Sequence, residues 1–184
     1  FHFGSITMIT EPSKSATLKA AEHAKAAGLL ISYDPNLRLN LWPDEGAAKM
    51  GMLAGFDYAN VVKVSAEELL FLTGGDDPAP LWRDHMKLIV VTHGSNGATA
   101  YTRDDRVEAS GFRVEPVDTT GAGDGFVAGL LTGLLAHPDD YTEHLRPILR
   151  RANAVGALTT TNRGAIPALP TTEQVDAFIA AQSE

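Results

Sequence analysis

The run from Asp118 to Gly125, D-T-T-G-A-G-D-G, combines residue types that can bind an anion and move a proton. It precedes an apolar stretch, residues 126–136, that predicts a buried helix ending at His137-Pro138. Glycines let the backbone turn, and the N–H groups of a first helical turn are unpaired and carry partial positive charge. Three backbone N–H groups are therefore predicted to hold an anion, those of Gly121, Ala122 and Gly123.

Asp124 is the carboxylate within this predicted anion site. A carboxylate there would repel an anion, unless it accepts a proton from a group that attacks the anion. The pattern thus favours phosphoryl transfer to a hydroxyl, with Asp124 as the base and the turn stabilising charge on the transferred group. A purely structural interpretation stays open, because Asp and Gly are also ordinary residues at helix starts.

The longer run D-T-T-G-A-G-D, followed by G-F-V-A-G-L-L, resembles the second signature of the ribokinase-like (phosphofructokinase-B-type) carbohydrate kinases, D-T-x-G-A-G-D. Two further segments, S-Y-D-P-N-L-R-L-N-L-W-P and F-H-F-G-S-I, resemble plant-type fructokinases. The resemblance implies that Asp124 is the catalytic base and that the glycine turn is the anion hole. Neither G-x-x-x-x-G-K-[ST] nor G-x-G-x-x-G occurs, which argues against a P-loop or a dinucleotide site.

The 184 residues, 44% of them apolar, suffice for one domain with a sizeable core. A strand at 1–6, a helix at 13–27 and a strand at 29–33 predict a parallel crossover and an α/β fold. Strands are also expected at 58–63, at 87–92 and within 102–117, and helices at 43–54, 145–158 and 171–181. The resemblance implies an open, mostly parallel sheet flanked by helices on both faces. Residues 1–184 would be the carboxyl-terminal nucleotide-binding portion of a single ribokinase-like domain, without its amino-terminal part and lid.

Asp34-Pro35-Asn36-Leu37-Arg38 follows the second predicted strand. Open parallel sheets place ligand groups at the carboxyl ends of their strands, although Asp-Pro-Asn is also good turn chemistry. A carboxylate, an amide and a guanidinium within five residues could address several hydroxyls or a phosphate. The resemblance implies Asn36 and Arg38 as contacts of substrate or phosphate.

The run V-T-H-G-S-N-G ends the strand predicted at 87–92. Turn chemistry explains its glycines, but V-T-x-G-x-x-G also resembles the nucleotide-phosphate loop of the kinase family. The resemblance makes Thr92, Gly94 and Gly97 candidates for binding ATP, and places Asn153 in the region that lines the adenine pocket. His93, a histidine without a partner in the sequence, is interpreted as incidental.

Ser65 and Glu68 have the spacing of a capping box, which by itself explains both residues. The surrounding K-V-S-A-E-E-L-L-F-L-T-G also resembles the family segment with an N-x-x-E motif, whose Glu helps to hold magnesium and phosphate. Glu68 then matches that Glu, while Ser65 replaces the Asn. The resemblance further implies a potassium site formed by Asp118 and the carbonyl of Thr120.

The net charge of −8, with 15 scattered basic residues, argues against nucleic-acid binding. The absence of cysteine excludes disulfides and thiolate metal sites and fits a reducing compartment such as the cytoplasm. No apolar run approaches the ~18 residues of a membrane-spanning helix. The chain starts at Phe1 rather than Met, so we expect a piece of a longer protein, in which a targeting peptide is left open.

The resulting hypothesis is ATP-dependent phosphorylation of a sugar primary hydroxyl, with fructose giving fructose 6-phosphate. The expected cofactors are ATP, Mg²⁺ and in addition K⁺. The expected partner is a small sugar, without nucleic acid or membrane, and a homodimer is an option for the parent protein. Without the family's sugar-binding residues and lid, this chain alone is expected to be inactive. Three alternatives stay open: another acceptor such as ribose, 2-keto-3-deoxygluconate or a nucleoside, a non-catalytic interaction module, and the disfavoured dinucleotide oxidoreductase.

Overall fold

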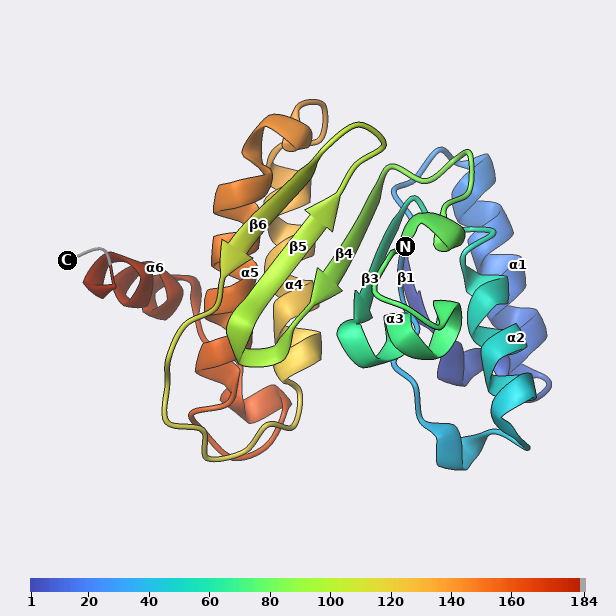
Figure 1. The fold of residues 1–184 in the computed structure, drawn as a ribbon, viewed down its shortest axis with the longest axis horizontal. Coiled ribbons are helices and arrows are strands. Elements are labelled where there is room, and N and C mark those ends of the chain that lie inside the picture. The colour runs from blue at the N-terminus through green and yellow to red at the C-terminus, as the bar shows by residue number, and fades with distance from the viewer. Residues whose placement is uncertain (183–184) are drawn as a thin grey trace. The chain divides into compact units, whose positions relative to one another are not determined.

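The computed structural model describes residues 1–182, which divide into two compact units. The first unit comprises Phe1–Thr92 and Tyr101–Asp104, and the second comprises the rest. The strands form one sheet in the order β1-β2-β3-β4-β5-β6 (Figure 1). They are β1 (His2–Gly4), β2 (Ser32–Asp34), β3 (Val61–Ser65), β4 (Leu88–Thr92), β5 (Gly97–Tyr101) and β6 (Arg106–Ser110). The helices of the first unit are α1 (Ser13–Ala26), α2 (Glu45–Gly55) and α3 (Ala66–Thr73).

Strands β1 to β4 run parallel, as the alternation of strands and helices predicts. Their register aligns Gly4 with Asp34 and Ser65 with Thr92, the last residues of the four strands. The carboxyl ends of these strands therefore meet along one edge of the sheet. This is the edge at which α/β proteins bind ligands.

The core of the first unit lies between these strands and helices. Residues of β2, β3 and β4 are buried almost throughout, and β4 confirms the strand predicted from the near-continuous apolar run at 87–92. Tyr33 is central: its ring stacks on Phe3 at a centroid distance of 4.7 Å and meets the edge of Phe56 at 5.6 Å. Its hydroxyl donates to the carbonyl of Met52 at 2.9 Å, so its one polar atom is satisfied. Burial raises the pKa of this phenol well above its ordinary value.

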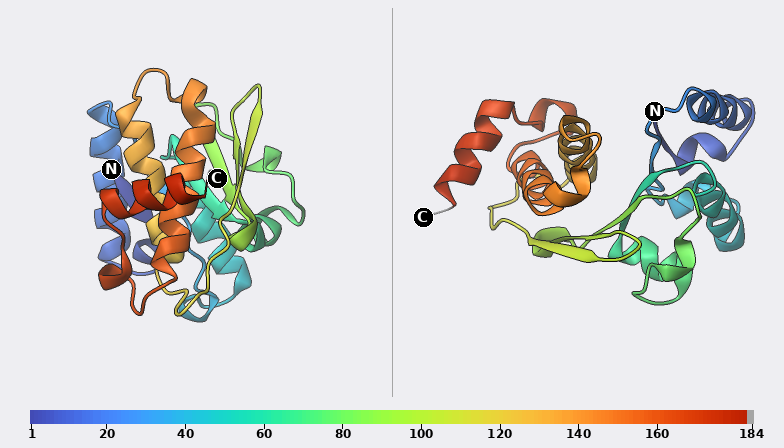
Figure 2. Two further views of the ribbon diagram at one scale, coloured as in Figure 1. Left: turned by 90° about the vertical axis from the view of Figure 1, so that its left-hand side faces the viewer. Right: turned by 90° about the horizontal axis from the view of Figure 1, so that it is seen from above.

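The second unit packs two long helices side by side, α4 (Ala122–Ala136) and α5 (Leu145–Thr159), as Figures 1 and 2 show. Glycines recur at every fourth residue of α4 and so share the face toward α5. A Cβ on Gly129 would lie 2.9 Å from the Cα of Ala152, and one on Gly133 would lie 2.8 Å from Ile148. The close contact between the helices therefore depends on these glycines having no side chain.

The last helix, α6 (Thr172–Ala181), lies beside α5 (Figure 2), and its Phe178 packs against Phe112 from the stretch after β6. The rings of Phe112 and Phe178 lie 5.0 Å apart, and the guanidinium of Arg150 lies 5.1 Å from the Phe112 ring. Phe112 belongs to the stretch in which short strands were expected. Between residues 102 and 117 the described chain forms only β6, so the expectation of further strands was wrong. Phe112 instead leaves the sheet to fill the core beside α5.

The helices predicted from capping and periodicity are confirmed as α1, α2, α5 and α6. The predicted capping box of Ser65 with Glu68 is present before α3, and the structure shows a second one, Thr171 with Gln174, before α6. The apolar run after Gly125 forms the predicted helix, but α4 is buried on one face only. Leu135 on its far side is 65% exposed, because only one face of α4 packs against α5. No helix in residues 1–182 has the length and apolar character needed to cross a membrane.

Candidate active site

The start of α4 is held in a tight turn of the second unit. Gly121 has φ 80°, the left-handed conformation that favours glycine, and a Cβ there would lie 2.7 Å from the Cβ of Ala165. The N–H of Ala122 donates to the carbonyl of Thr119 at 3.2 Å, and that of Gly125 donates to the carbonyl of Gly121 at 2.8 Å. Both the backbone angle and the space around it therefore require glycine at position 121.

The free donors of this turn differ slightly from the predicted set. Within residues 1–182, the N–H groups of Gly121, Gly123 and Asp124 donate to no protein acceptor. The N–H of Ala122, the third predicted donor, is used by the turn itself. Asp124 is exposed in the first turn of α4, and its own N–H adds a donor that the sequence analysis did not include. A helix start with unpaired N–H groups can bind an anion, and the exposed carboxylate beside it can accept a proton.

Asp118 anchors this turn to the segment that follows α5. Its carboxylate accepts hydrogen bonds from the N–H of Gly164 and from the N–H of Thr120, each at 2.9 Å. These two bonds lower the pKa of the Asp118 carboxyl to about 2, because they stabilise the ionised form. The N–H groups of Val117 and Asp118 both donate to the carbonyl of Thr160, at 2.7 and 3.1 Å. The carboxylate is therefore a fixed negative charge, and each oxygen keeps a lone pair for a cation.

The two glycines after β4 have different environments. Gly97 has φ 107°, and a Cβ there would lie 2.1 Å from the carbonyl oxygen of Ala109. Its presence is thus explained by the close approach of β6. Gly94 has φ 58° with open space around it, so packing does not account for it. His93, interpreted from the sequence as having no partner, lies with Nε2 3.0 Å from the hydroxyl of Thr99.

Asn153 is buried in α5, where its amide nitrogen donates to the carbonyls of Ala109 and Ser110, at 3.0 and 3.2 Å. Both amide hydrogens therefore hold the end of β6. This structural role accounts for the residue and leaves its amide oxygen for a ligand. One helix start thus brings together Asp118, Thr120 and residues 121–124. Gly97 of β5 and Asn153 of α5 instead both contact β6.

In the first unit, Asp34 and Lys63 form a buried ion pair at the carboxyl edge of the sheet. Lys63 Nζ lies 3.2 Å from Asp34 Oδ2, and both residues are less than 10% exposed. Burial raises the pKa of the Asp34 carboxyl to about 6, with Lys63 opposing that rise and the charge of Glu68 adding to it. The pair places a coupled carboxylate and ammonium beside the segment predicted to bind substrate.

Glu68 joins this segment to α3. One carboxylate oxygen accepts from the N–H of Leu37 and the other from the N–H of Ser65, both at 2.7 Å. The residue is 7% exposed. The predicted capping box is therefore present, and the Glu68 side chain also fixes the loop after β2. With both oxygens already accepting hydrogen bonds, Glu68 fits a magnesium ion best through bridging water.

The loop after β2 contains the predicted substrate contacts. Asn36 has φ 49°, an uncommon conformation outside glycine that Asn tolerates, and its N–H donates to Asp34 Oδ1 at 3.2 Å. The side chain of Arg38 is exposed, and Nη1 donates to the carbonyl of Leu37 at 3.1 Å. Thr92, the candidate at the end of β4, is half-buried, with its hydroxyl 3.4 Å from the carbonyl of Val64. The carboxyl edge of the first unit thus gathers Asn36, Arg38, Glu68 and Thr92.

Two residues of these sites, Lys63 and Gly164, were not predicted from the sequence as functional residues. Lys63 was included in an apolar strand without comment, although a lysine between buried valines needs a counter-charge. Asp34, at the end of the neighbouring predicted strand, was the available candidate. Gly164 was assigned only to a loop, and nothing local in the sequence indicates its bond to Asp118, 46 residues away.

The first unit has a parallel sheet with polar groups at its carboxyl edge, and the second has a glycine turn with an exposed carboxylate at a helix start. These features define an α/β protein. The model of the pfkB family of carbohydrate kinases matches residues 1–172. The chain belongs to this family of carbohydrate kinases.

Among its relatives, "Probable fructokinase-4" of Arabidopsis thaliana is 50% identical over 189 residues, covering 97% of this chain and 57% of the relative. "Fructokinase-2" of Zea mays is 47% identical, covering 98% of this chain and 56% of the relative. The chain therefore spans a little over half the length of these relatives.

Solved structures agree with the fold. The fructokinase of Vibrio cholerae O395, in a form with fructose, ADP and calcium bound, has a TM-score of 0.87 and 38% identity, covering 96% of this chain and 59% of that one. The fructokinase of Xylella fastidiosa with bound ATP has a TM-score of 0.92 and 35% identity, covering 100% of this chain and 62% of that one. These similarities bear out the ribokinase-like fold expected from the sequence, as a mixed six-stranded sheet flanked by helices.

Proposed function

We propose that the protein transfers the γ-phosphoryl group of ATP to the primary hydroxyl of fructose, giving ADP and fructose 6-phosphate. The observation that carries this proposal is the exposed carboxylate of Asp124 beside the unpaired N–H groups of Gly121 and Gly123. In a chain of this family, the arrangement supports a base next to an anion hole. The fructose, ADP and ATP bound to the Vibrio and Xylella proteins support the choice of substrates.

In the proposed reaction, Asp124 accepts the proton of the attacking hydroxyl while its oxygen bonds to the γ-phosphorus and the bond to ADP breaks. The free N–H groups of the turn stabilise the charge on the transferred group. Thr92 and Gly94 are our candidates for ATP contacts, with Gly97 and Asn153 supporting them. Asn36 and Arg38 are our candidates for contacts to sugar or phosphate.

Two cations accompany the proposal. Glu68 would hold Mg²⁺ through water, and the metal would neutralise charge on the ATP phosphates. Asp118 and the carbonyl of Thr120 would hold K⁺. The hydrogen bonds that keep Asp118 ionised, with its pKa at about 2, support that assignment. Carboxylate oxygens and backbone carbonyl oxygens both suit these hard cations.

The test is an ADP-release assay on the full-length protein with fructose, ribose, 2-keto-3-deoxygluconate and a nucleoside as acceptors. Fructose should give the highest kcat/KM. Asp124→Asn should lower kcat by ~10²-fold or more, the scale expected for loss of a general base. Asp76→Asn, which alters an exposed carboxylate in the turn after α3, is the matched control and should leave kcat unchanged. A loss of only a few-fold in Asp124→Asn would remove the base from the mechanism.

A nucleoside acceptor is the second candidate, since the aminoimidazole riboside kinase of Salmonella enterica has a TM-score of 0.87 and 33% identity to this chain. A preference for the riboside in the same assay would replace fructose. If the folded protein is inactive with every acceptor tested, a non-catalytic interaction module is favoured.

We propose further that residues 1–184 form the carboxyl-terminal, nucleotide-binding portion of a single kinase domain, inactive by itself. The support is that the chain covers 57% of an Arabidopsis relative at 50% identity. Comparing the isolated chain with the full-length protein in the same assay tests this, and size-exclusion chromatography tests a homodimer. We also propose a cytoplasmic location, with the plastid as the alternative because one relative is named "Probable fructokinase-6, chloroplastic". A fluorescent fusion of the full-length protein distinguishes the two.

A further inference from the structure

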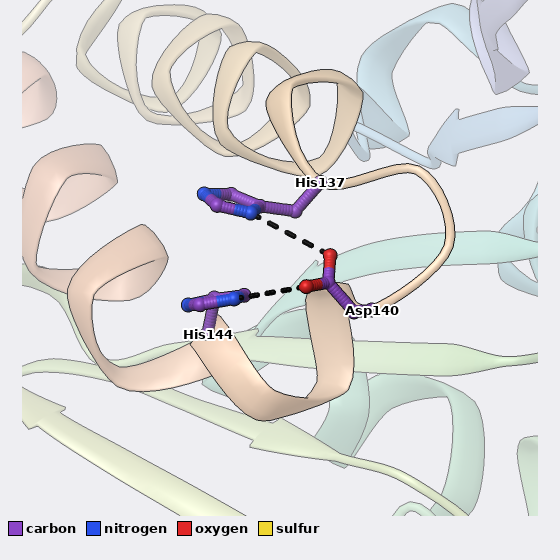
Figure 3. Close-up of side chains that lie close together, drawn as sticks. All are labelled: His137, Asp140 and His144. Atoms are coloured by element: carbon purple, nitrogen blue, oxygen red, sulfur yellow. Dashed lines mark hydrogen bonds and ion pairs between the residues drawn. The ribbon is translucent and has the colours of Figure 1, made fainter.

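Three ligand-type side chains meet at the opposite end of α4 from Asp124. His137 directly follows the last residue of the helix, and Asp140 and His144 lie in the connection that leads to α5. Figure 3 shows both imidazole rings facing the one carboxylate. At 1.5 Å per residue, the helix between them separates this cluster from Asp124 by about 20 Å. The proposed reaction therefore does not use these residues.

The geometry suits one metal ion. His137 Nδ1 lies 3.6 Å from Asp140 Oδ1, and His144 Nε2 lies 3.2 Å from Asp140 Oδ2. One ligand atom from each residue lies within 4.8 Å of the other two. Ligand atoms around tetrahedral zinc are roughly 3.3 Å apart, given bonds near 2.0–2.2 Å. A small closing movement of exposed side chains would therefore complete three bonds to one ion.

The two imidazole rings stack on each other, so they have to tilt apart for both nitrogens to point at one ion. Their centroids lie 3.9 Å apart with an interplanar angle of 26°, so the rings stack and present a nitrogen each toward Asp140. Stacking restricts the rotation of both side chains before any ion binds. The three side chains are 37–50% exposed, which gives an ion access and leaves room for water as a further ligand.

The local charge also favours a cation. Besides the ligand Asp140, residues 137–145, H-P-D-D-Y-T-E-H-L, contain two acidic side chains, Asp139 and Glu143, and no lysine or arginine. The nearest arginine in sequence, Arg146, donates to the carbonyl of Glu108 at 3.1 Å. The carboxyl end of α4 lies beside His137 and the start of α5 lies beside His144, so the two helix dipoles act on the cluster in opposite senses. The negative charges of Asp139 and Glu143 are independent of the three ligand side chains.

We propose that His137, Asp140 and His144 form a binding site for a transition metal ion of the zinc class. Two imidazoles and one carboxylate are ligands that zinc, nickel and copper accept, whereas magnesium prefers oxygen alone. The bound ion cross-links the end of α4 to the start of α5. Its expected effect is on the stability of this helix pair, because the site is remote from Asp124.

The experiment titrates the full-length protein with ZnCl₂ against a chromophoric chelator, in the presence of excess MgCl₂. One Zn²⁺ per chain should bind at this site, and the melting temperature should rise with Zn²⁺. The variant His137→Ala/His144→Ala should weaken binding by at least about tenfold, an effect that even outer partners of metal ligands have. It should also abolish the thermal shift.

His23→Ala is the matched control, because His23 is an exposed histidine of α1 whose Nδ1 lies near the carbonyl of Lys19 instead of a carboxylate. It should bind Zn²⁺ as the unaltered protein does. Asp140→Asn keeps the side-chain shape and should also weaken binding, which guards against a double variant that unfolds. Equal Zn²⁺ affinity in the double variant and the unaltered protein would overturn the proposal. So would an absence of saturable binding at sub-millimolar Zn²⁺.

Discussion

Replacing Lys63 by methionine tests whether the Asp34–Lys63 pair is as buried as the structure indicates. The side chains are 7% and 10% exposed, and methionine keeps the apolar stem of lysine while removing its charge. The pKa of Asp34 rises from 3.8 to about 6 even with Lys63 present. At 1.36 kcal/mol per pKa unit, ionised Asp34 already costs folding about 3 kcal/mol at pH 7. Removing its partner should cost folding up to about 3 kcal/mol more at pH 8, because a carboxyl that stays protonated loses about 1.36 kcal/mol for each pH unit above the pKa of about 6 that Asp34 has beside Lys63.

The pH dependence distinguishes this mechanism from a simple packing defect. A carboxyl whose pKa is raised by folding contributes stability that is present below pH 3.8 and is lost as the pH rises through the folded value. Without Lys63 the folded pKa of Asp34 should rise further, so the deficit of the variant should appear above about pH 6. Near pH 5 the carboxyl is largely protonated in both proteins, and the deficit should shrink to about 1 kcal/mol or less.

The measurement is urea unfolding of the full-length protein at pH 5 and pH 8, with Lys25→Met, an exposed lysine of α1, as the matched control. The control should shift stability by no more than about 0.5 kcal/mol at either pH. The double variant Asp34→Asn/Lys63→Met should recover part of the loss, because it leaves neither charge unpaired. An equal deficit at both pH values would refute the reasoning, since a titrating carboxyl would then not be responsible.

Four more substitutions test other contacts by urea unfolding of the full-length protein. Gly97→Ala should lower the free energy of unfolding by about 3 kcal/mol or more, because its Cβ would lie 2.1 Å from a carbonyl oxygen. Gly94→Ala should lower it by about 1 kcal/mol, from backbone strain alone. Equal losses in the two variants would contradict the packing argument. Gly129→Val should cost about 2 kcal/mol or more by forcing α4 from α5, and a neutral effect would show that the helices separate freely. Glu68→Gln should lower the free energy of unfolding by about 2 kcal/mol, since one of the two backbone N–H groups that Glu68 accepts from loses its acceptor. If Glu68 has the proposed metal role, the variant should also need a higher Mg²⁺ concentration for activity.

The parts of the fold that could be predicted from the sequence are those governed by local physics. The capping boxes at Ser65 and Thr171 depend only on residues three positions apart, and both are present. The apolar run at 87–92 marks a strand buried on both faces. The glycine-rich turn before α4 was predicted as an unpaired helix start because the donors belong to the backbone itself.

What could not be predicted depends on pairing between distant segments. Lys63 and Asp34 are 29 residues apart, and their contact follows from the register between β2 and β3. The use of the Ala122 N–H by Thr119 depends on the angle at which the chain enters the helix. Phe112 leaves the sheet because a hydrophobic site beside α5 and α6 exists only in the folded protein. Hydrophobic pattern and spacing contain no information on these relations.

The packing of α4 on α5 fixes the position of the glycine turn that we propose to bind an anion. The turn's two anchors, the carbonyl of Thr160 and the N–H of Gly164, lie immediately after α5. Since the spacing of the two helices is set by glycines with no room for a side chain, the anchors have a defined position relative to the start of α4. The unpaired N–H groups beside Asp124 therefore do not have to be ordered when an anion binds. An anion site ordered in advance in this way costs less conformational entropy on binding.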